Sequence, residues 1–209
     1  MIELNKVCKS FKGKKVIKDF SLCIKEGEFV AITGASGTGK TTILNLIGGL
    51  IFPDEGEISV LSIKNPTNKA FQILRRDKLG YIFQNFVLMD NETVLENLKI
   101  SKMYNPEWSI DLAKTYLELV GLNEAYLHKK IYELSGGEQQ RVSIVRLLLK
   151  KCSIALADEP TGNLDRTNKI IIIDVFKKMK KQGKTIICVT HDEEVALAAD
   201  RIVEIKALA

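Results

Sequence analysis

The alternation of apolar and polar residues over the first third of the chain is typical of β-strands. Three segments share this alternation and an enrichment in β-branched and aromatic residues: IELNKV (2–7), FSLCIKE (20–26) and EFVAIT (28–33). A Glu-Gly pair at 26–27 predicts a turn between the last two segments. Further along, DEGEISVL (54–61) predicts a turn and a short strand, and LGYIF (79–83) predicts a strand that is followed by Gln84.

Two stretches show the helical period instead. The segment KTTILNLIGGL (40–50) has apolar residues at helical spacing and ends on a glycine pair, which predicts a helix. From about residue 92 to residue 130 the pattern is helical throughout. One apolar stripe in this stretch is formed by Trp108, Leu112, Tyr116 and Leu119. We interpret the stripe as part of the core rather than as a cofactor-binding surface.

The last third of the chain alternates between the two periods. Helices are predicted at 136–151, at about 165–182 and in a short segment after 190, and strands at 153–158, 185–190 and 201–205. Strands that alternate with helices indicate a parallel sheet covered by helices on both faces. The sequence therefore predicts an α/β fold whose core is interrupted by an all-helical insertion of roughly 45 residues.

Length and composition limit the class of protein. A chain of 209 residues is long enough to bury a full core, and its 45% apolar and 27% charged residues argue against a disordered or fibrous protein. The start MIELNKV shows no secretory signal, and no uninterrupted apolar run approaches the roughly 18 residues of a membrane span. We therefore expect a cytoplasmic protein whose role at a membrane depends on a partner.

Cysteines and net charge suggest little further chemistry. Cys8, Cys23, Cys152 and Cys188 form no Cys-x-x-Cys pair and have mostly apolar neighbours, which predicts reduced, buried thiols. The net charge of +5 is modest, and its densest part, KKMKKQGK (177–184), falls at the end of a predicted helix, where cations complement the helix dipole. Because no aromatic residues are interleaved with these lysines, we expect no nucleic-acid partner.

The segment GASGTGKTT (34–42) has the spacing of a phosphate-binding loop, follows a predicted strand and opens a predicted helix. Glycines let backbone N–H groups surround phosphate oxygens, Lys40 neutralises the β and γ phosphates, and the Thr41 hydroxyl ligates magnesium. The predicted cofactors are therefore ATP and Mg²⁺. The loop residues that we expect to bind the nucleotide are Gly34, Ser36, Gly37, Gly39, Lys40, Thr41 and Thr42.

Two carboxylates end the apolar strand in SIALADEP (153–160). Ligands of open parallel sheets bind where the strands end, so Asp158 and Glu159 should lie beside the phosphate loop. Successive side chains of a strand point in opposite directions, which allows Asp158 to hold Mg²⁺ and Glu159 to orient the attacking water and accept its proton. The alternative is a solvated strand end, which the phosphate loop makes a weak explanation.

His191 and Gln84 each follow a predicted strand of the same sheet. His191, in VTHDE (189–193), is placed to donate to the γ-phosphate and to help position the water. Gln84 is placed to reach Mg²⁺ or the same water. For both residues the alternative is a polar side chain that merely ends a strand, and the functional role of Gln84 depends on the family.

The segment LSGGEQQRV (134–142) has a serine and two glycines directly before a predicted helix. A helix start gathers unpaired N–H groups and the positive end of the helix dipole, so Ser135, Gly136 and Gly137 are suited to hold an anion. The chain already has one complete phosphate loop. The question is therefore which phosphate this second site serves.

Together and in this order, these segments resemble the ATP-binding subunit of ATP-binding cassette transporters, over nearly the whole chain. The segments that carry the resemblance are the phosphate loop, Gln84, LSGGEQQRV, the acidic strand IALADEP, TGNLD (161–165) and the histidine of VTH. The resemblance implies a P-loop NTPase (RecA-like) parallel-sheet core with an N-terminal antiparallel β subdomain and an inserted α-helical subdomain. It implies one domain, 1–209, in which 1–84 and 136–209 form the α/β part and about 85–135 the helical part.

The resemblance also answers the question of the second anion site. In this family two cassettes pair head to tail, and each signature segment, here 134–142, caps the ATP held on the opposite subunit. Ser135 and Gly137 would then contact the γ-phosphate of that subunit. By the same resemblance Asn163 and Asp165 belong to a loop that crosses the interface, and Phe11 stacks on the adenine.

The resemblance further implies an ATPase that works with an integral membrane permease and with a second copy of itself or a paralogous cassette. Such a protein is cytoplasmic and peripheral on the inner face of the cell membrane. GASGTGKTT and DEPTGNLD resemble most the cassettes of the macrolide, lipoprotein and antimicrobial-peptide exporter group. We therefore expect export of a peptide, lipoprotein or drug-like substrate.

Alternatives to export remain at this stage. A cassette can also transmit force to cell-wall enzymes without moving cargo, or act as a soluble ATPase on DNA or ribosomes. The absence of a long heptad run and of a second cassette disfavours the soluble type. The chain ends about 18 residues after His191, so we expect no regulatory C-terminal domain of the sugar-importer kind. The apolar run 86–89 is either a permease-docking surface or buried core.

Overall fold

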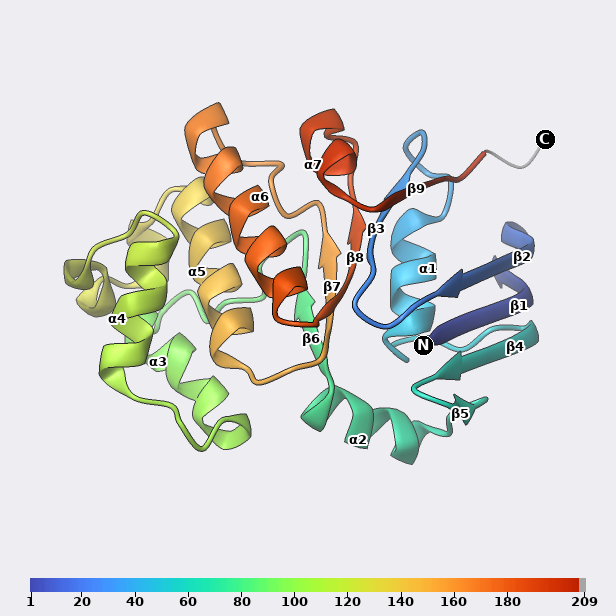
Figure 1. Cartoon of the computed structure of the whole chain (residues 1–209), viewed down its shortest axis with the longest axis horizontal. Helices are drawn as coiled ribbons and strands as arrows, with labels where there is room; N and C mark the ends of the chain where they lie inside the picture. The colour runs from blue at the N-terminus through green and yellow to red at the C-terminus, as the bar shows by residue number, and fades with distance from the viewer. Residues whose placement is uncertain (207–209) are drawn as a thin grey trace.

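The structure, a computed structural model that describes residues 1–206, contains two β-sheets (Figure 1). The first is antiparallel, with strand order β2-β1-β4-β5, and the second is parallel, with strand order β6-β7-β8-β3-β9. The antiparallel strands are β1 (Ile2–Phe11), β2 (Lys14–Ile24), β4 (Glu55–Val60) and β5 (Ile63–Lys64). The parallel strands are β3 (Phe29–Thr33), β6 (Leu79–Ile82), β7 (Ile154–Asp158), β8 (Thr185–Val189) and β9 (Arg201–Glu204).

Helices cover both faces of the parallel sheet. The α-helices are α1 (Lys40–Ile47), α2 (Asn68–Asp77), α3 (Val94–Lys99), α4 (Ile110–Leu119), α5 (Gly136–Leu149), α6 (Arg166–Lys181) and α7 (Glu193–Ala198). Three short 3₁₀ helices accompany α3 and α4: η1 (Ile100–Tyr104), η2 (Glu124–His128) and η3 (Ile131–Glu133). Figure 1 shows α1 between the two sheets, α5 and α6 on the opposite face of the parallel sheet, and α3 and α4 beyond α5.

Alternation along the strands divides the buried side chains into two cores. Val30 and Ile32 of β3 pack with α1 and the antiparallel sheet, whereas Phe29 packs on the other side with α5 and α6. The rings of Phe29 and Phe176 meet edge to face, with centroids 5.9 Å apart. Because both faces of the sheet are buried at its inner strands β3, β7 and β8, these strands are predominantly apolar, as expected for a parallel sheet.

The register of the parallel strands brings three chain segments to one edge. Asp158 of β7 lies opposite Val189 of β8, and Ile32 of β3 lies opposite the same residue. The loop after β3, the residues after Asp158 and the residues after Val189 therefore leave the sheet side by side. This edge is where the α/β topology places a ligand site.

Several elements differ from those predicted. Helix α2 was not predicted because only two of its side chains, Phe71 and Leu74, are buried, so its apolar pattern is short. The predicted stripe of the helical stretch does pack against the core, although Trp108 precedes α4, which begins at Ile110. Strand β5 was also not predicted, and β1 and β2 extend beyond the predicted segments.

The predicted burial of the cysteines is correct for three and wrong for one. Cys8, Cys152 and Cys188 are buried free thiols, whereas Cys23 is exposed. The reason is strand alternation: Leu22 and Ile24 of β2 point into the core, so Cys23 between them points outward.

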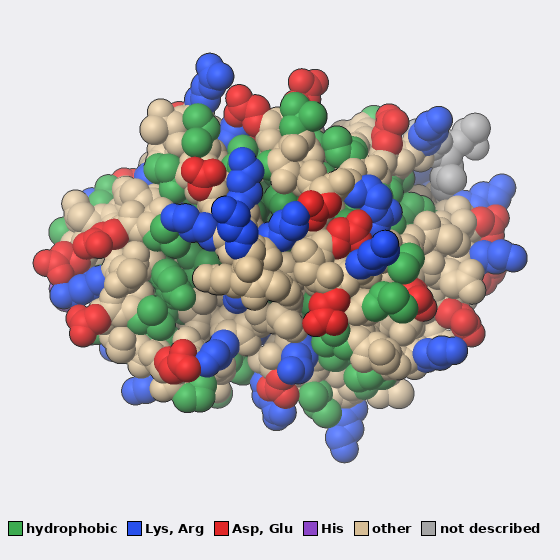
Figure 2. Space-filling view, in the orientation of Figure 1, with side chains coloured by type: hydrophobic (Ala, Val, Ile, Leu, Met, Phe, Trp, Pro, Cys, Tyr) green, Lys and Arg blue, Asp and Glu red, His purple; other side chains and the backbone are tan. Residues whose placement is uncertain are grey.

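The basic segment lies where it was predicted, at the carboxyl end of a helix. Lys178, Lys180 and Lys181 occupy the last turn of α6, and Figure 2 shows basic side chains, Lys or Arg, gathered over the region of this helix. Across residues 1–206, no helix combines the length and apolar character that crossing a membrane requires.

Candidate nucleotide-binding site

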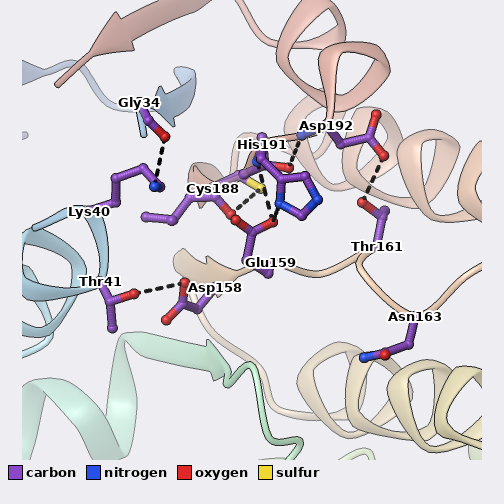
Figure 3. Close-up of polar contacts among 12 residues, drawn as sticks. Gly34, Lys40, Thr41, Asp158, Glu159, Thr161, Asn163, Cys188, His191 and Asp192 are labelled. Carbon is purple, nitrogen blue, oxygen red and sulfur yellow. Dashed lines mark hydrogen bonds and ion pairs between the residues drawn. The ribbon is translucent and has the colours of Figure 1, made fainter. Parts of the chain in front are cut away.

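The phosphate loop connects β3 to α1 and is held by its own lysine. Lys40 Nζ donates to the carbonyl oxygens of Gly34 and Ala35, each at 2.8 Å (Figure 3 draws the first). Gly39, at the start of α1, has φ 94°, and a Cβ atom there would lie 2.5 Å from Ile17 Cδ1. The loop therefore requires glycine at this position for both backbone and packing. Its lysine is placed to exchange carbonyl oxygens for phosphate oxygens.

Thr41 and Asp158 face each other across the bottom of the site (Figure 3). The Thr41 hydroxyl donates to Asp158 Oδ1 at 3.2 Å, which confirms the predicted proximity of the strand end to the phosphate loop. Burial raises the pKa of Asp158, whereas the hydrogen bond from Thr41 lowers it. Gln84 lines the same cavity. A hydroxyl, a carboxylate and an amide oxygen form a donor set of the kind that Mg²⁺ prefers.

Glu159 points away from Asp158 and toward His191, as strand alternation predicts. His191 Nδ1 lies 2.8 Å from Glu159 Oε2, and the His191 backbone N–H donates to the same oxygen at 3.3 Å (Figure 3). Glu159 has φ 49°, a left-handed conformation that is rare for a residue with a side chain. Its N–H donates to the Val189 carbonyl at 2.9 Å, which ties this backbone to β8. The site therefore holds, next to a histidine, a carboxylate whose residue has a strained backbone.

The predicted site residues line two cavities beside the phosphate loop. The first, of about 270 Å³, is lined by Val16, Ser36, Gly37, Gly39, Lys40, Thr41, Thr42, Gln84, Asp158, Glu159 and Val189. The second, of about 340 Å³, is lined by Gly34, Ser36, Lys40, Gln84, Glu159, Gly162, Asn163 and His191. The structure thus brings together the predicted residues of the phosphate loop, both carboxylates, His191 and Gln84.

The signature segment lies apart from these cavities, at the start of α5. Ser135 is the N-cap of α5 and forms a capping box with Glu138, whose Oε2 accepts hydrogen bonds from the Ser135 N–H at 2.7 Å and from its hydroxyl at 2.9 Å. Within residues 1–206, neither cavity beside the phosphate loop is lined by Ser135, Gly136 or Gly137. The predicted second anion site is therefore separate from the phosphate loop in this chain.

Comparison with known proteins identifies the family. The family model described as "ABC transporter" matches residues 17–162. An uncharacterised ABC transporter ATP-binding protein of Methanocaldococcus jannaschii, MJ0796, is 41% identical, over 99% of this chain and 93% of that protein. The chain belongs to the ABC transporter family. It is an ATPase domain of that family, an ABC cassette that binds ATP.

Other relatives of this cassette are named for export. The lipoprotein-releasing system ATP-binding protein LolD of Aquifex aeolicus is 39% identical, over 99% of this chain and 94% of LolD. The macrolide export ATP-binding/permease protein MacB of Campylobacter jejuni is 41% identical over 99% of this chain. The cassette spans only 33% of that MacB, about a third of its length.

Solved structures confirm the fold of the cassette. The dimeric structure of MJ0796 has a TM-score of 0.91 at 41% identity and covers 99% of this chain and 94% of that one. A dimeric post-hydrolysis state of MJ0796 bound to ADP and Pi has a TM-score of 0.91 at 38% identity, over 100% of this chain and 97% of that one. The predicted α/β fold, with its parallel core and N-terminal antiparallel sheet, is therefore correct.

Phe11 and Asp165 lie at the margins of the cassette's site. Phe11, at the end of β1, is 44% exposed, and Lys9 Nζ lies 5.7 Å from its ring centroid. Asp165 is the N-cap of α6, where its carboxylate accepts from the Asn168 N–H at 2.8 Å, and this bond lowers the pKa of Asp165. Of the described chain, neither residue lines either of the two cavities that contain the predicted site residues. Binding of nucleotide by either one stays a prediction.

Val16, Val189 and Gly162 line the two cavities but were not predicted from the sequence, and neither was Gln140, which contacts the site through hydrogen bonds. Gln140, fully buried in α5, donates from Nε2 to the main-chain oxygen of Glu159 at 3.4 Å and accepts from Asn163 Nδ2 at 3.4 Å. It therefore joins the signature helix to the strained backbone of Glu159 and to the loop 161–165. The only sequence signal was a glutamine at a buried position of the helix.

Proposed function

We propose that this cassette hydrolyses Mg-ATP as half of a head-to-tail pair and thereby powers an integral membrane permease that exports a peptide, lipoprotein or drug-like substrate. The observation that carries the proposal is the separation of the two anion sites. Lys40, Glu159 and His191 converge on the phosphate loop, whereas the helix start at Ser135 lies outside both cavities there. A second cassette, identical or paralogous, would supply the phosphate that this helix start fits.

The residues of the first site have complementary roles in this proposal. Lys40 and the glycine-rich backbone bind the β and γ phosphates. Thr41, Asp158 and Gln84 would hold Mg²⁺, which neutralises charge on the phosphates. Glu159 orients a water for in-line attack on the γ-phosphate and accepts its proton. His191 donates to the γ-phosphate oxygens and, through its contact with Glu159, keeps that carboxylate in place.

The remaining predicted residues would bind the adenine and connect the two copies. Phe11 offers an exposed ring for stacking on the base. Gly137 lets the signature helix approach the loop 161–165, because a Cβ atom there would lie 2.9 Å from the Asn163 carbonyl oxygen. We propose that this loop, which contains Asn163 and Asp165, crosses to the other cassette. Closure of the pair would exclude water and strengthen the charge interactions around the γ-phosphate.

The loop after Gln84 is our proposed docking surface for the permease. Val87 is 51% and Met89 is 41% exposed, whereas Phe86 and Leu88 are half-buried, which disfavours the alternative of a buried core. The loop leads into the helical stretch of about 85–135, which we propose as a separate subdomain. The names of LolD and MacB support export, and a membrane partner would hold the cassette on the inner face of the cell membrane.

The pairing is tested by mixing two inactive variants. Lys40→Ala disables the site of its own chain, and Ser135→Arg disables the site of its neighbour. Each variant alone should be nearly inactive. In a mixture, half of randomly formed pairs would contain both variants and one intact composite site, so activity should return to about a quarter of the wild-type rate. A mixture no more active than its components would contradict the proposed pairing.

The membrane partner is tested by co-purification from detergent-solubilised membranes. The tagged cassette should retain a protein with several membrane spans, and Val87→Asp with Met89→Asp should release it. The matched control is Ile73→Asp, since Ile73 is an equally exposed apolar residue, 48% exposed, on the distant helix α2. Recovery of nucleic acid or ribosomes instead, or equal retention by all variants, would contradict the proposed docking surface.

A further inference from the structure

A strained turn follows Gln84. Phe86 and Val87 have φ angles of 61° and 51°, a backbone conformation that residues other than glycine rarely adopt. It is least favourable for a β-branched residue such as valine. Within the turn, the Phe86 N–H donates to the Phe83 carbonyl at 3.0 Å and the Val87 N–H to the Asn85 carbonyl at 2.6 Å. Two successive residues in this conformation persist only where their surroundings hold them.

The guanidinium of Arg146 holds this turn. Its Nη1 donates to the Val87 carbonyl at 2.6 Å and its Nη2 to the Phe86 carbonyl at 2.7 Å. Within residues 1–206, no other side chain forms a hydrogen bond with the segment 83–88. One rigid fork therefore binds the two successive carbonyls of the two strained residues.

The Arg146 guanidinium has no other hydrogen-bond acceptor or ion-pair partner among the described residues. Burial lowers the pKa of Arg146, and no carboxylate of the described chain pairs with it. A cation that is removed from water and has lost its acceptors is costly. The turn and the arginine therefore stabilise each other: the guanidinium needs the two carbonyls, and the carbonyls keep their strained positions because of it.

Helix α5 connects this contact to the signature segment. Ser135 caps the start of α5, and Arg146 lies near its carboxyl end in the same continuous helix. In Figure 1 the chain that leaves β6 passes behind α5 on its way to α3, and the two hydrogen bonds place the contact there. Because Ser135 and Arg146 lie on one continuous helix, a shift of α5 at Ser135 would also move the guanidinium that binds Phe86 and Val87.

We propose that Arg146 is a positioning residue for Gln84: it fixes the strained turn 86–87 and thereby sets the place of Gln84 in the nucleotide site according to the position of the signature helix. Gln84 lines both cavities of that site and stands two residues before the turn. The inference rests on the proposed role of Gln84 beside Mg²⁺ and the attacking water. It assigns Arg146 no contact with substrate.

A double-mutant cycle on ATP turnover tests the dependence on Gln84. Arg146→Gln should lower kcat about tenfold, the scale expected when a reacting group is misplaced, and should raise the Mg²⁺ concentration that gives half-maximal activity. In a Gln84→Ala background the same change should cost less than about twofold. Equal losses in both backgrounds would overturn the proposal, because Arg146 would then act independently of Gln84. Arg146→Lys, which keeps the charge but loses the fork, should show an intermediate effect and replaces Arg146→Gln if the latter fails to fold.

Backbone amide exchange supplies a readout that needs no activity. Arg146→Lys should accelerate exchange in 83–90 at least about tenfold and leave α6 unchanged. The matched control is Arg141→Gln on the same helix. Arg141 donates to the carbonyls of Val120 and Gly121, so its substitution should accelerate exchange around those residues and not in 83–90. Unchanged exchange in 83–90 would overturn the contact. If Gln84→Ala leaves ATP turnover at the wild-type rate while Arg146→Lys still accelerates exchange in 83–90, the proposed role of Gln84 fails and the Arg146 contact stands.

Discussion

The imidazole of His191 and the carboxylate of Glu159 form a pair whose nitrogen and oxygen lie 2.8 Å apart, at the ends of adjacent strands. When His191 is neutral, Nδ1 carries the proton in this pair and Nε2 is left as an acceptor. Donation to a phosphate through Nε2 together with donation to Glu159 through Nδ1 would use both ring nitrogens as donors. In the proposed mechanism, binding of the γ-phosphate and placement of the Glu159 carboxylate would thus be linked through one ring.

Glu159→Gln should reduce ATP turnover at least about a hundredfold, because an amide accepts no proton from the attacking water. The substitution keeps the size of the side chain, so nucleotide binding should persist and the ATP-bound pair should accumulate. Steady-state turnover and size-exclusion chromatography with ATP measure the two effects. Turnover close to the wild-type rate would refute the assigned role.

Thr41→Val should raise the Mg²⁺ concentration needed for half-maximal activity, since it replaces the hydroxyl that faces Asp158 with a methyl group. A several-fold increase is expected when ATP is saturating. Binding of ATP measured with a chelator present should change little, because Lys40 and the loop backbone remain. The control is Thr41→Ser, which retains the hydroxyl and should retain the wild-type requirement. An unchanged requirement in Thr41→Val would contradict the metal role.

Asp192→Asn should lower the free energy of unfolding by about 1 kcal/mol or less near neutral pH. Burial alone would raise the pKa of Asp192, but its ion pair with Lys169 at 2.6 Å and its bonds from the Glu194 N–H and Thr161 outweigh burial and lower it. A carboxylate whose pKa is lowered in the folded state stabilises the fold at pH values above about 3.9, the ordinary pKa of aspartate. This stabilisation is lost as the pH falls through the lowered pKa. Urea unfolding between pH 7 and 3 should show the difference from wild type shrinking only below about pH 4. A difference that stays constant over this range would contradict the ionic contribution.

Gly49→Ala should destabilise the fold by about 3 kcal/mol or more. Gly49 has φ 63°, and a Cβ atom there would lie 2.1 Å from the ring of Phe71. Gly183→Ala is the matched control, because Gly183 has φ 81° but no atom within 4 Å of the added methyl. It should show only the backbone cost of about 1 kcal/mol. Equal losses in thermal or urea unfolding would contradict the clash at Phe71.

The fold and most of the first site were predictable because their patterns are local. The phosphate loop, the acidic strand end and the apolar strands are each short segments, and the parallel topology then requires their ends to meet. Helix α2 was not predictable in this way, since it buries only Phe71 and Leu74 and its apolar pattern is therefore too short to reveal a helical period. Its Thr67 N-cap, whose hydroxyl accepts from the Ala70 N–H, was the available signal.

Contacts between segments distant in the chain could not be read from the sequence. Arg146 lies 59 positions from Val87 and Gln140 lies 19 positions from Glu159, so no spacing reveals either contact. The backbone strain at Glu159 and Val87 was equally hidden, because neither residue is of a type that favours positive φ. Such strain depends on tertiary contacts, which only the folded chain displays.

The capping box at the start of α5 has a consequence for how the proposed pair of cassettes would separate. Glu138 already accepts the hydrogen bonds of the Ser135 N–H and hydroxyl, and the Tyr126 hydroxyl bonds to its other oxygen at 2.5 Å. In the proposed pair, the incoming phosphate must displace this carboxylate, and after phosphate departs the carboxylate returns. The helix start therefore always has an anionic acceptor, either from the neighbour's nucleotide or from its own chain. Release therefore leaves the Ser135 N–H and hydroxyl bonded to Glu138 rather than free to recapture the phosphate.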